Sequence, residues 1–433
     1  MLIEFTVGNY RSFKDPATLS MVATKIVSQD KRLDQENVIE VPGGPDLLTS
    51  AAVYGANASG KSNLVEALNF MRSFVLGSAE GTRATGGIRV EPFRLSTETI
   101  NRHSHFEIVF VALDRQYRYG FEASRDRVHR EWLYYVPSAR EARLFEREGE
   151  RISLSSVFRE GRGLEEKTRP NALFLSVAAQ FNGDTARTIT NWFLDMDVIS
   201  GLDDTWSRDT TLTLWDDPDG FAQVARFVKG LDLNIEDLKL EQDQRLIEQY
   251  RAEFPDLFAP DRDWKMPGAH RIKTMHRRFD ATGNLQGVEL FDLDNHESEG
   301  TRKLFALSGA LLASLACGTE LIADEFDARL HPLITRRLIE LFNSREHNPR
   351  RAQLVITTQD TNLLDNRLFR RDQIWFTEKD RFGATHLYSL AEFRGVRNDA
   401  SFERDYVRGR YGAIPFLGDP GRLTGNGDGQ TTN

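Results

Sequence analysis

The stretch AAVYGANASGKSNLVEAL, residues 51–68, contains residue types that can hold phosphate. Gly55, Gly60, Lys61 and Ser62 fill the four fixed positions of the pattern G-x-x-x-x-G-K-[ST]. Glycines let the backbone turn so that successive N–H groups point at one anion, and a following helix adds its positive N-terminal end. This spacing predicts a cradle for a triphosphate. The alternative is a glycine-rich turn that binds nothing.

The polar side chains of this loop have distinct expected roles. We expect Lys61 to reach the β- and γ-phosphates. The Ser62 hydroxyl would complete the coordination shell of Mg²⁺, which prefers hard oxygen ligands. ATP and Mg²⁺ are therefore the expected cofactors. The other residues expected to contact the nucleotide lie in the loop or open the helix behind it, and they are Asn57, Ala58, Ser59 and Asn63.

An acidic motif lies much later in the chain, in GTELIADEFDARLHP. An apolar strand over residues 321–323 ends there in Asp324 and Glu325. A carboxylate at the end of a buried strand beside a phosphate loop can hold Mg²⁺ through water, and the next carboxylate can polarise the attacking water. We expect Asp324 to bind the metal and Glu325 to act as the general base. The alternative is a solvated loop or a helix cap.

Just before this strand, the segment NHESEGTRKLFALSG places Ser298, Gly300 and Thr301 at the start of an apolar helix. A hydroxyl group and the N–H groups at a helix N-terminus can receive a γ-phosphate. The alternative is an ordinary capped helix, with Ser298 or Thr301 as the cap. The uncharged run over residues 304–319 is too short to span a membrane, so we expect a buried helix there.

The elements that must position these residues are a strand over residues 51–54, a helix that begins near Lys61 and the late acidic strand. More than half of the chain separates Lys61 from Asp324, so a large insertion must split the core. The expected organisation has four parts. They are an N-terminal ATPase lobe over 1–190, a mainly helical insertion over 191–285, a C-terminal lobe over 286–415 and a disordered tail over 416–433.

At this point the chain resembles a known group of proteins. The order of VGNYRSF, GANASGKS, a long insertion, SEGT, LIADEFD and LVITTQDTNLLD is similar to the ABC-type ATPase heads of the SMC and RecF kind. More narrowly, RRDQIWFTEKD and GRYGAIPF resemble the AAA-domain ATP-binding proteins of bacterial abortive-infection and RloA-like phage-defence modules. The resemblance implies an α/β P-loop ATPase head with a split core. It also implies an ATP-dependent homodimer in which the signature helix of one subunit faces the ATP of the other.

The chain departs from this pattern at two positions. The resemblance implies a histidine after LVITT, but Gln359 stands there; glutamine can donate a hydrogen bond and carries no charge, so we expect slow or differently gated hydrolysis. The segment RVEPFRLS has no Q-loop glutamine, and Gln116 is a weak substitute. His331, in RLHP, matches the family pattern or caps a helix.

Composition narrows the class of protein further. With 433 residues, of which 40% are hydrophobic, the chain can bury substantial cores. The single cysteine, Cys317, excludes an internal disulfide and is expected in the core. The start MLIEFTVGNYRSF alternates like a strand and has no export leader, so we expect a cytoplasmic protein. The net charge of −9 argues against a general polyanion binder, although it leaves room for a local basic groove.

Three functions fit these observations. The first is a Mg²⁺-dependent ATPase that controls an effector, which the defence resemblance suggests is a TOPRIM-like nuclease. The second is a DNA-repair ATPase that binds DNA directly, and the third is a nucleotide-gated scaffold whose turnover is incidental. Glu289, Asp292 and Asp294 could themselves suggest a TOPRIM metal site, but strand-end acids are the simpler interpretation.

Overall fold

The computed structural model describes most of the chain, including all residues of the expected site. The described residues are 1–80, 86–138, 140–203, 205–215, 218–231, 234–242, 244–253, 270–397 and 400–415. The tail over 416–433, for which the sequence predicts disorder, lies outside the described residues.

A six-stranded sheet forms the centre of the molecule. Its order is β11-β15-β16-β5-β17-β18, with parallel pairing from β11 to β17 and an antiparallel edge strand β18. The central strands β5 and β16 are buried along their whole length, as expected for parallel strands covered on both faces. The bounds are Asp197–Ser200 for β11, Glu320–Asp324 for β15, Gln353–Thr357 for β16, Ser50–Tyr54 for β5, Ile374–Lys379 for β17 and Thr385–Ser389 for β18.

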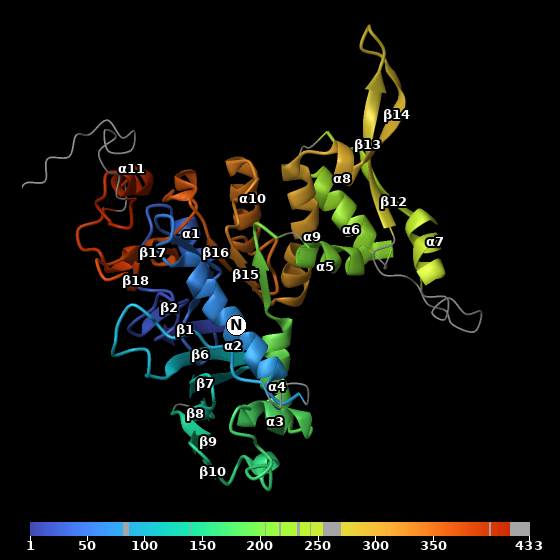
Figure 1. Ribbon diagram of the computed structural model, residues 1–433. Coiled ribbons are helices and arrows are strands. Elements are labelled where there is room, and N and C mark those ends of the chain that lie inside the picture. Colours follow the sequence, from blue (N-terminus) through green and yellow to red (C-terminus); the bar gives the residue numbers. More distant parts are fainter. Residues whose placement is uncertain are drawn as a thin grey trace, which may run out of the picture.

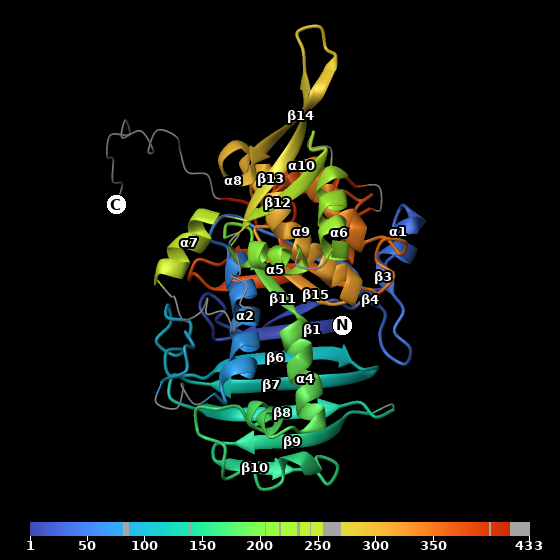
Figure 2. The same cartoon turned by 90° about the vertical axis from the view of Figure 1, so that its right-hand side faces the viewer.

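A seven-stranded antiparallel sheet forms the lower part of the molecule in Figures 1 and 2. Its order is β10-β9-β8-β7-β6-β1-β2. Buried and partly buried residues alternate along β6, so one face of this sheet packs on the core. The bounds are Leu2–Gly8 for β1, Ala17–Ser20 for β2, Ser104–Ala112 for β6, Arg115–Ala123 for β7, Val128–Tyr135 for β8, Ala142–Glu148 for β9 and Arg151–Leu154 for β10.

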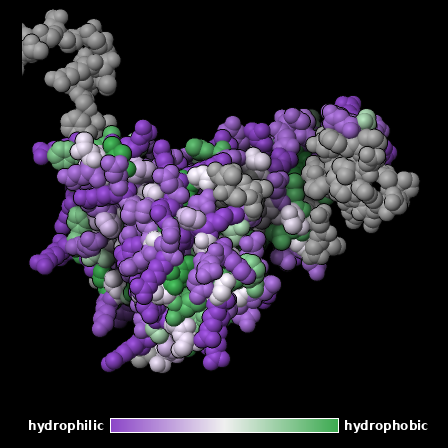
Figure 3. All heavy atoms as spheres, turned by 60° about the horizontal axis from the view of Figure 1, so that its bottom comes forward, coloured by the Kyte–Doolittle hydropathy of each residue, from purple (hydrophilic) through white to green (hydrophobic). Residues whose placement is uncertain are grey.

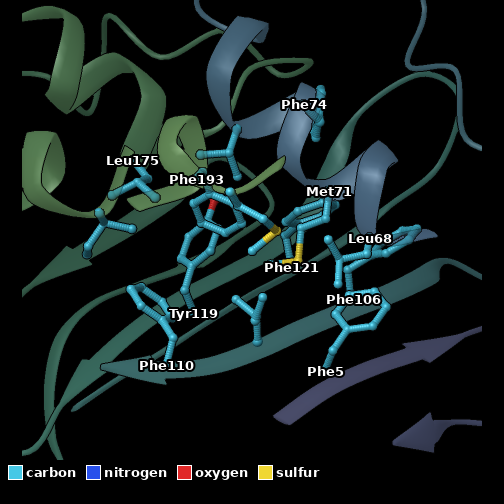
Figure 4. Packing of buried hydrophobic residues seen from close by; sticks show 14 of the residues in the cluster. Phe5, Leu68, Met71, Phe74, Phe106, Phe110, Tyr119, Phe121, Leu175 and Phe193 are labelled. Carbon is cyan, nitrogen blue, oxygen red and sulfur yellow. The ribbon is translucent and has the colours of Figure 1, made fainter. Parts of the chain in front are cut away.

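Helix α2, Lys61–Gly77, joins the two sheets. Its Leu68, Met71 and Phe74 meet aromatic residues of β6 and β7 in the main hydrophobic cluster, as Figure 4 shows. The rings of Phe74 and Phe121 are 5.4 Å apart in an edge-on arrangement. Helices α3 (Phe174–Gln180) and α4 (Asp184–Asp195) contact α2 and complete this core. The lower end of the molecule, seen in Figure 3, is mostly hydrophilic with small hydrophobic areas.

The insertion combines helices with a small sheet of order β12-β13-β14. Figures 1 and 2 show β13 and β14 as a ribbon that rises above the rest of the molecule. The bounds are Thr205–Trp215 for α5, Pro218–Lys229 for α6, Asp237–Gln242 for β12, Gln244–Glu253 for α7, His270–Phe279 for β13, Leu285–Asp292 for β14 and Leu293–His296 for α8.

The insertion differs from its expected limits of 191 and 285. Residue 190 lies inside the amphipathic helix α4, and β11 after it pairs with β15 in the central sheet. Residue 285 is the first residue of β14, which pairs with β13 down to Asp292. Strand β14 has few buried positions. Its sequence therefore lacks the alternation of apolar and polar residues that marks a half-buried strand.

The remaining elements surround the central sheet. Helix α9, Glu299–Cys317, is the expected buried helix, and among the described residues no helix is both long and apolar enough to cross a membrane. Cys317 was expected in the core but is exposed, because the last turn of α9 extends beyond the buried part of the helix. The other bounds are Lys31–Glu36 for α1, Val38–Ile39 for β3, Leu47–Leu48 for β4, Pro332–Phe342 for α10 and Phe402–Val407 for α11.

Candidate functional site

The phosphate loop leaves β5 and enters α2 through closely packed glycines. Gly60 is the N-cap of α2 and has a φ of 116°, which side chains rarely allow. A Cβ atom on Gly60 would lie 2.3 Å from Oγ1 of Thr385, and one on Gly55 would lie 2.4 Å from the carbonyl oxygen of Thr377. Asn57 and the following alanine, at the tip of the loop, are exposed. The strand–loop–helix expected from the sequence is therefore present.

A set of hydroxyl groups from distant strands holds this loop in place. Ser59 Oγ lies 2.7 Å from Oγ1 of Thr377 on β17, and Thr385 on β18 donates its hydroxyl to the Ser59 carbonyl at 2.8 Å. The Thr385 hydroxyl also lies 2.8 Å from Ser12 Oγ, which accepts from Asn63 Nδ2 at 2.7 Å. Sequence reasoning missed Ser12, Thr377 and Thr385, and it assigned Asn63 to the nucleotide; here its side chain supports the loop.

Lys61 lies over the loop that precedes it. Its Nζ donates to the carbonyl oxygens of Gly55 at 2.7 Å and Ala56 at 3.2 Å. Burial lowers the pKa of Lys61, and nearby negative charges oppose this shift. Those charges belong to Asp324, Glu325 and Asp327. Ser62 is exposed in the first turn of α2. The structure thus places the expected phosphate-binding cation in the field of the expected acidic residues.

One hydroxyl group holds the carboxylate of Asp324 and the backbone of Glu325. Thr357, the last residue of β16, donates its Oγ1 hydrogen to Oδ1 of Asp324 at 2.5 Å and accepts from the N–H of Glu325 at 2.8 Å. Glu325 has a φ of 48°, a left-handed conformation that is uncommon for residues other than glycine. Backbone strain of this kind often marks a functional position. Sequence reasoning missed Thr357, although it lies in the quoted motif LVITT.

The carboxyl ends of β5, β15 and β16 lie at one edge of the central sheet because the three strands are parallel neighbours. That edge brings together Lys61, Asp324 and Gln359, which is exposed two residues after β16. Hydroxyl and carboxylate oxygens at one strand edge suit a hard cation, so Ser62 and Asp324 fit Mg²⁺. The loop, with a lysine and a helix N-terminus, fits a polyphosphate.

The SEGT segment forms the start of α9, apart from the phosphate loop. Ser298 is the N-cap of α9, and its Oγ accepts from the N–H of Thr301 at 3.1 Å. This confirms the capping interpretation, while a signature role for Ser298, Gly300 and Thr301 stays a prediction. In Figure 1 the start of α9 lies beside α8, on the other side of the β15 label from α2. In this view the start of α9 does not lie beside the start of α2, which follows the phosphate loop.

Two other expectations concern single residues. His331 is the N-cap of α10 and its Nδ1 accepts from the N–H of Leu333 at 3.2 Å, so the capping alternative is confirmed. Gln116 lies within β7 of the antiparallel sheet, where its carbonyl oxygen accepts from Val136.

The acids suggested as a TOPRIM site are each held by a separate cation. Glu289 pairs with Arg278 at 3.3 Å, Asp292 with Lys273 at 3.2 Å and Asp294 with Arg208 at 2.5 Å. In the part of the chain that the structure describes, no group of three or more His, Cys, Asp or Glu residues could hold a metal ion. Asp292 ends β14, whereas Glu289 lies inside that strand and Asp294 lies in α8, so the strand-end interpretation holds for Asp292 alone.

Comparison with known proteins places the chain in a family. Residues 50–365 match the family described as "AAA domain, putative AbiEii toxin, Type IV TA system". The chain belongs to this AAA-domain family. The match runs from the start of β5 to the residues after β16, so it spans the phosphate loop, the insertion and the acidic strand. The fold of this AAA-domain protein is α/β with a split core, since the insertion separates β5 and the phosphate loop from β15.

Solved structures of SMC heads are similar to this AAA-domain protein at low sequence identity. A SmcHead bound to the C-winged helix domain of ScpA has 13% identity and a TM-score of 0.42, with coverage of 90% of this chain and 97% of that chain. The SMC head domain from Thermotoga maritima has 11% identity and a TM-score of 0.39, with coverage of 90% and 98%. An Smc head with an extended coiled coil, bound to the C-terminal domain of ScpA derived from Pyrococcus furiosus, has 13% identity and a TM-score of 0.36, with coverage of 90% and 96%. A comparison with curated protein sequences finds no match.

Proposed function

We propose that this protein binds Mg–ATP, hydrolyses it and forms a homodimer while ATP is bound. The observation that carries the proposal is the meeting of Lys61, Asp324 and Glu325 at one sheet edge, although more than half of the chain separates the lysine from the acids. A phosphate-binding cation, a metal-binding carboxylate and a general base are the parts that phosphoryl transfer to water requires. Gly55, Gly60 and Ser62 complete the expected nucleotide-binding loop.

The residues of this chain would act in a fixed order. Lys61 and the loop N–H groups bind and orient the phosphates, and Ser62 and Asp324 hold the magnesium ion that neutralises their charge. Glu325 then accepts a proton from the attacking water. The Thr357 hydroxyl would position the carboxylate of Asp324 and the backbone of Glu325, because it contacts an oxygen of Asp324 and the N–H of Glu325. Gln359 lies at the same edge and can orient the water through hydrogen bonds without adding charge.

The dimer follows from the position of the SEGT segment. Ser298, Gly300 and Thr301 start a helix whose N-terminus can receive a γ-phosphate, but they lie apart from the phosphate loop of their own chain. In a two-fold assembly each start of α9 would meet the ATP held by the other subunit. Two ATP molecules would then hold the two subunits together.

The proposed role of this cycle is the control of a partner effector in the cytoplasm, in bacterial anti-phage defence. The support is the family to which the chain belongs, together with the resemblance of its motifs to ATPases of defence modules. A TOPRIM-like nuclease is the proposed effector because of the resemblance to defence modules; within this chain Glu289, Asp292 and Asp294 are held in separate ion pairs. Conformational change on ATP turnover would control the effector.

The test uses Glu325→Gln, which keeps the shape of the side chain and removes its basicity. General bases typically contribute about 10² to 10⁴ to a rate, so we expect ATP to stay bound while hydrolysis slows by about a hundredfold or more. The trapped protein should elute as a dimer in light-scattering chromatography with Mg–ATP and as a monomer without nucleotide. Unchanged turnover would place the general base elsewhere, and a monomer with bound ATP would refute the dimer.

A further inference from the structure

Lys303 is a buried cation of α9 that the nucleotide chemistry above does not use. It lies two residues after Thr301, and no part of it is exposed. Its Nζ donates to the carbonyl oxygen of Gly201 at 2.7 Å and lies 3.5 Å from that of Ser200. An ammonium group is expensive to bury without partners, so these carbonyl oxygens are part of what stabilises the charge of Lys303. It joins the helix of the SEGT segment to the end of β11.

Gly201 in turn touches the backbone of both acidic residues, Asp324 and Glu325. Its N–H donates to the carbonyl oxygen of Asp324 at 2.6 Å. A Cβ atom on Gly201 would lie only 1.9 Å from the carbonyl oxygen of Glu325, so glycine is required there by contact with that peptide. Because Glu325 has a positive φ and its N–H is held by Thr357, a shift of Gly201 would press on the Glu325 peptide and so reach the backbone that carries its side chain.

A second contact joins the same two segments. A Cβ atom on Gly300 would lie 2.9 Å from the carbonyl oxygen of Arg329, and Nε of Arg329 lies 3.8 Å from Oε2 of Glu299. The turn that follows Glu325 therefore packs directly against the start of α9. Movement of the α9 N-terminus would reach the acidic strand end both through Lys303 and through this turn.

In the proposed dimer these contacts join two different ATP sites. The start of α9 meets the ATP held by the other subunit, whereas Glu325 serves the ATP held by its own Lys61. We propose that the contact from Lys303 through Gly201 to Glu325 couples the two sites, so that ATP at one site positions the general base of the other. Lys303 and Gly201 are positioning residues in this proposal, which rests on the proposed function.

The test compares the ATP dependence of hydrolysis in the wild type and in Lys303→Met. The wild-type dimer should show a Hill coefficient above 1, with an upper limit of about 2 for two sites. Methionine keeps the length and packing of the side chain but cannot bond to Gly201. We expect the Hill coefficient to fall to about 1 and the maximal rate to fall by about tenfold, with ATP-dependent dimerisation retained.

The matched control is Thr211→Val on α5. The Thr211 hydroxyl bonds to the carbonyls of Phe305 and Ala306 and accepts from the N–H of Gly309, so its loss also removes buried hydrogen bonds to α9. It touches neither Gly201 nor the acidic strand end in those bonds. The control should lower the unfolding midpoint and leave the Hill coefficient at its wild-type value. Equal loss of cooperativity in both variants would make Lys303 a general support of α9 and overturn the proposal.

A second measurement does not depend on a folded Lys303 variant. Dimers of one wild-type and one Lys61→Ala chain, purified through two different tags, keep one intact ATP site. The working Glu325 then belongs to the subunit whose α9 faces the defective site, so turnover per intact site should fall below that of the wild type. Equal turnover, or a wild-type Hill coefficient of 1 in an ATP-dependent dimer, would overturn the coupling and leave the proposed function standing. Absence of wild-type hydrolysis or dimerisation would instead refute the proposed function.

Discussion

The Lys61 ammonium is buried over the carbonyl oxygens of its own loop. Its folded pKa lies below the ordinary 10.5 because burial disfavours the charged form. The folded chain therefore binds fewer protons than the unfolded chain between these two pKa values. At pH values below the folded pKa, the buried charge lowers the free energy of unfolding. This destabilisation disappears as the pH rises from the folded pKa to the unfolded pKa. Because the Lys61 charge lowers the stability of the fold, we expect Lys61 to serve ligand binding.

Lys61→Met should separate these two effects. We expect the affinity for Mg–ATP to fall by about 10- to 100-fold, because a hydrogen bond to a charged group is worth about 1.5–3 kcal/mol. The thermal unfolding midpoint at neutral pH should stay the same or rise, since a buried ammonium group is removed. Calorimetric titration and thermal unfolding measure the two quantities. A folded variant with wild-type affinity would remove Lys61 from the site.

Thr357→Val tests the hydroxyl that holds the acidic pair. Valine has nearly the same shape but cannot donate to Asp324 or accept from the N–H of Glu325. We expect kcat to fall by about tenfold or more, as a charge-assisted bond of about 1.5–3 kcal/mol is lost. The control is Thr358→Val, the next residue, whose hydroxyl accepts from the N–H of Asp360. If both variants turn over ATP equally, Thr357 has no special role in positioning the acids.

At the scale of elements, the β17–β18 hairpin determines whether the phosphate loop can keep its shape. Thr377 and Thr385 touch Ser59 from one side, and Thr385 leaves no space for a side chain on Gly60. The loop is therefore held by strands that follow it by more than 300 residues. Binding of a phosphate chain needs no large rearrangement of a loop held in this way.

Gly60→Ala should lose ATP binding and lower the free energy of unfolding by several kcal/mol. The added Cβ atom would lie 2.3 Å from Thr385 Oγ1 at a φ of 116°. Gly283→Ala is the matched control, because this turn glycine also has a positive φ, 86°, but has open space around it. We expect it to cost about 1 kcal/mol and to keep ATP binding. Chemical denaturation and nucleotide titration give both quantities. Equal effects of the two changes would argue against the role of Thr385 in holding the phosphate loop.

The sequence predicted those parts of the site that lie within one continuous motif. The phosphate loop and the pair Asp324 and Glu325 each lie at the end of an apolar strand. The motif and the strand that positions it can therefore be recognised from one stretch of sequence. Ser12, Thr377 and Thr385 lie in three separate strands or turns and meet the loop only after the sheets have formed. A lone serine or threonine in a strand or turn gives no signal of such a contact. For this reason the sequence did not predict the hydroxyl groups that hold the loop.

The same limit applies to larger elements. Four residues, Asp197–Ser200, form β11 in the central sheet. Because this strand is so short and follows a long helix, the sequence predicts that it belongs to the insertion. Ser298 shows the opposite difficulty, since one arrangement of residues serves as a helix cap and as a phosphate-binding signature. The cap is visible in one chain, whereas a signature acts only across two chains.

In Figure 1 the strand β15 points toward the upper side of the molecule, where α8 and the start of α9 also lie. The parallel strands β5, β15 and β16 all end on that side, and α8 leads there into α9. A second copy related by a two-fold axis could therefore place each α9 over the other phosphate loop. This arrangement uses the same surface on both subunits and needs no further component.

Complementation between two inactive variants tests this shared site. Lys61→Ala removes the phosphate-binding cation, and Ser298→Arg places a bulky charge at the start of α9, so each homodimer has two defective sites. In a mixed dimer, one site combines both defects and the other joins an intact loop to an intact α9. Random exchange makes about half of the dimers mixed, so about a quarter of wild-type ATPase activity should return if the sites act independently. Coupling through Lys303 would lower that fraction, because the working base then faces a defective neighbour. A Ser298→Arg homodimer with normal turnover would show that α9 does not complete the site, whereas verified exchange of tagged chains without any recovery would mean that both sites must be intact or that no site is shared.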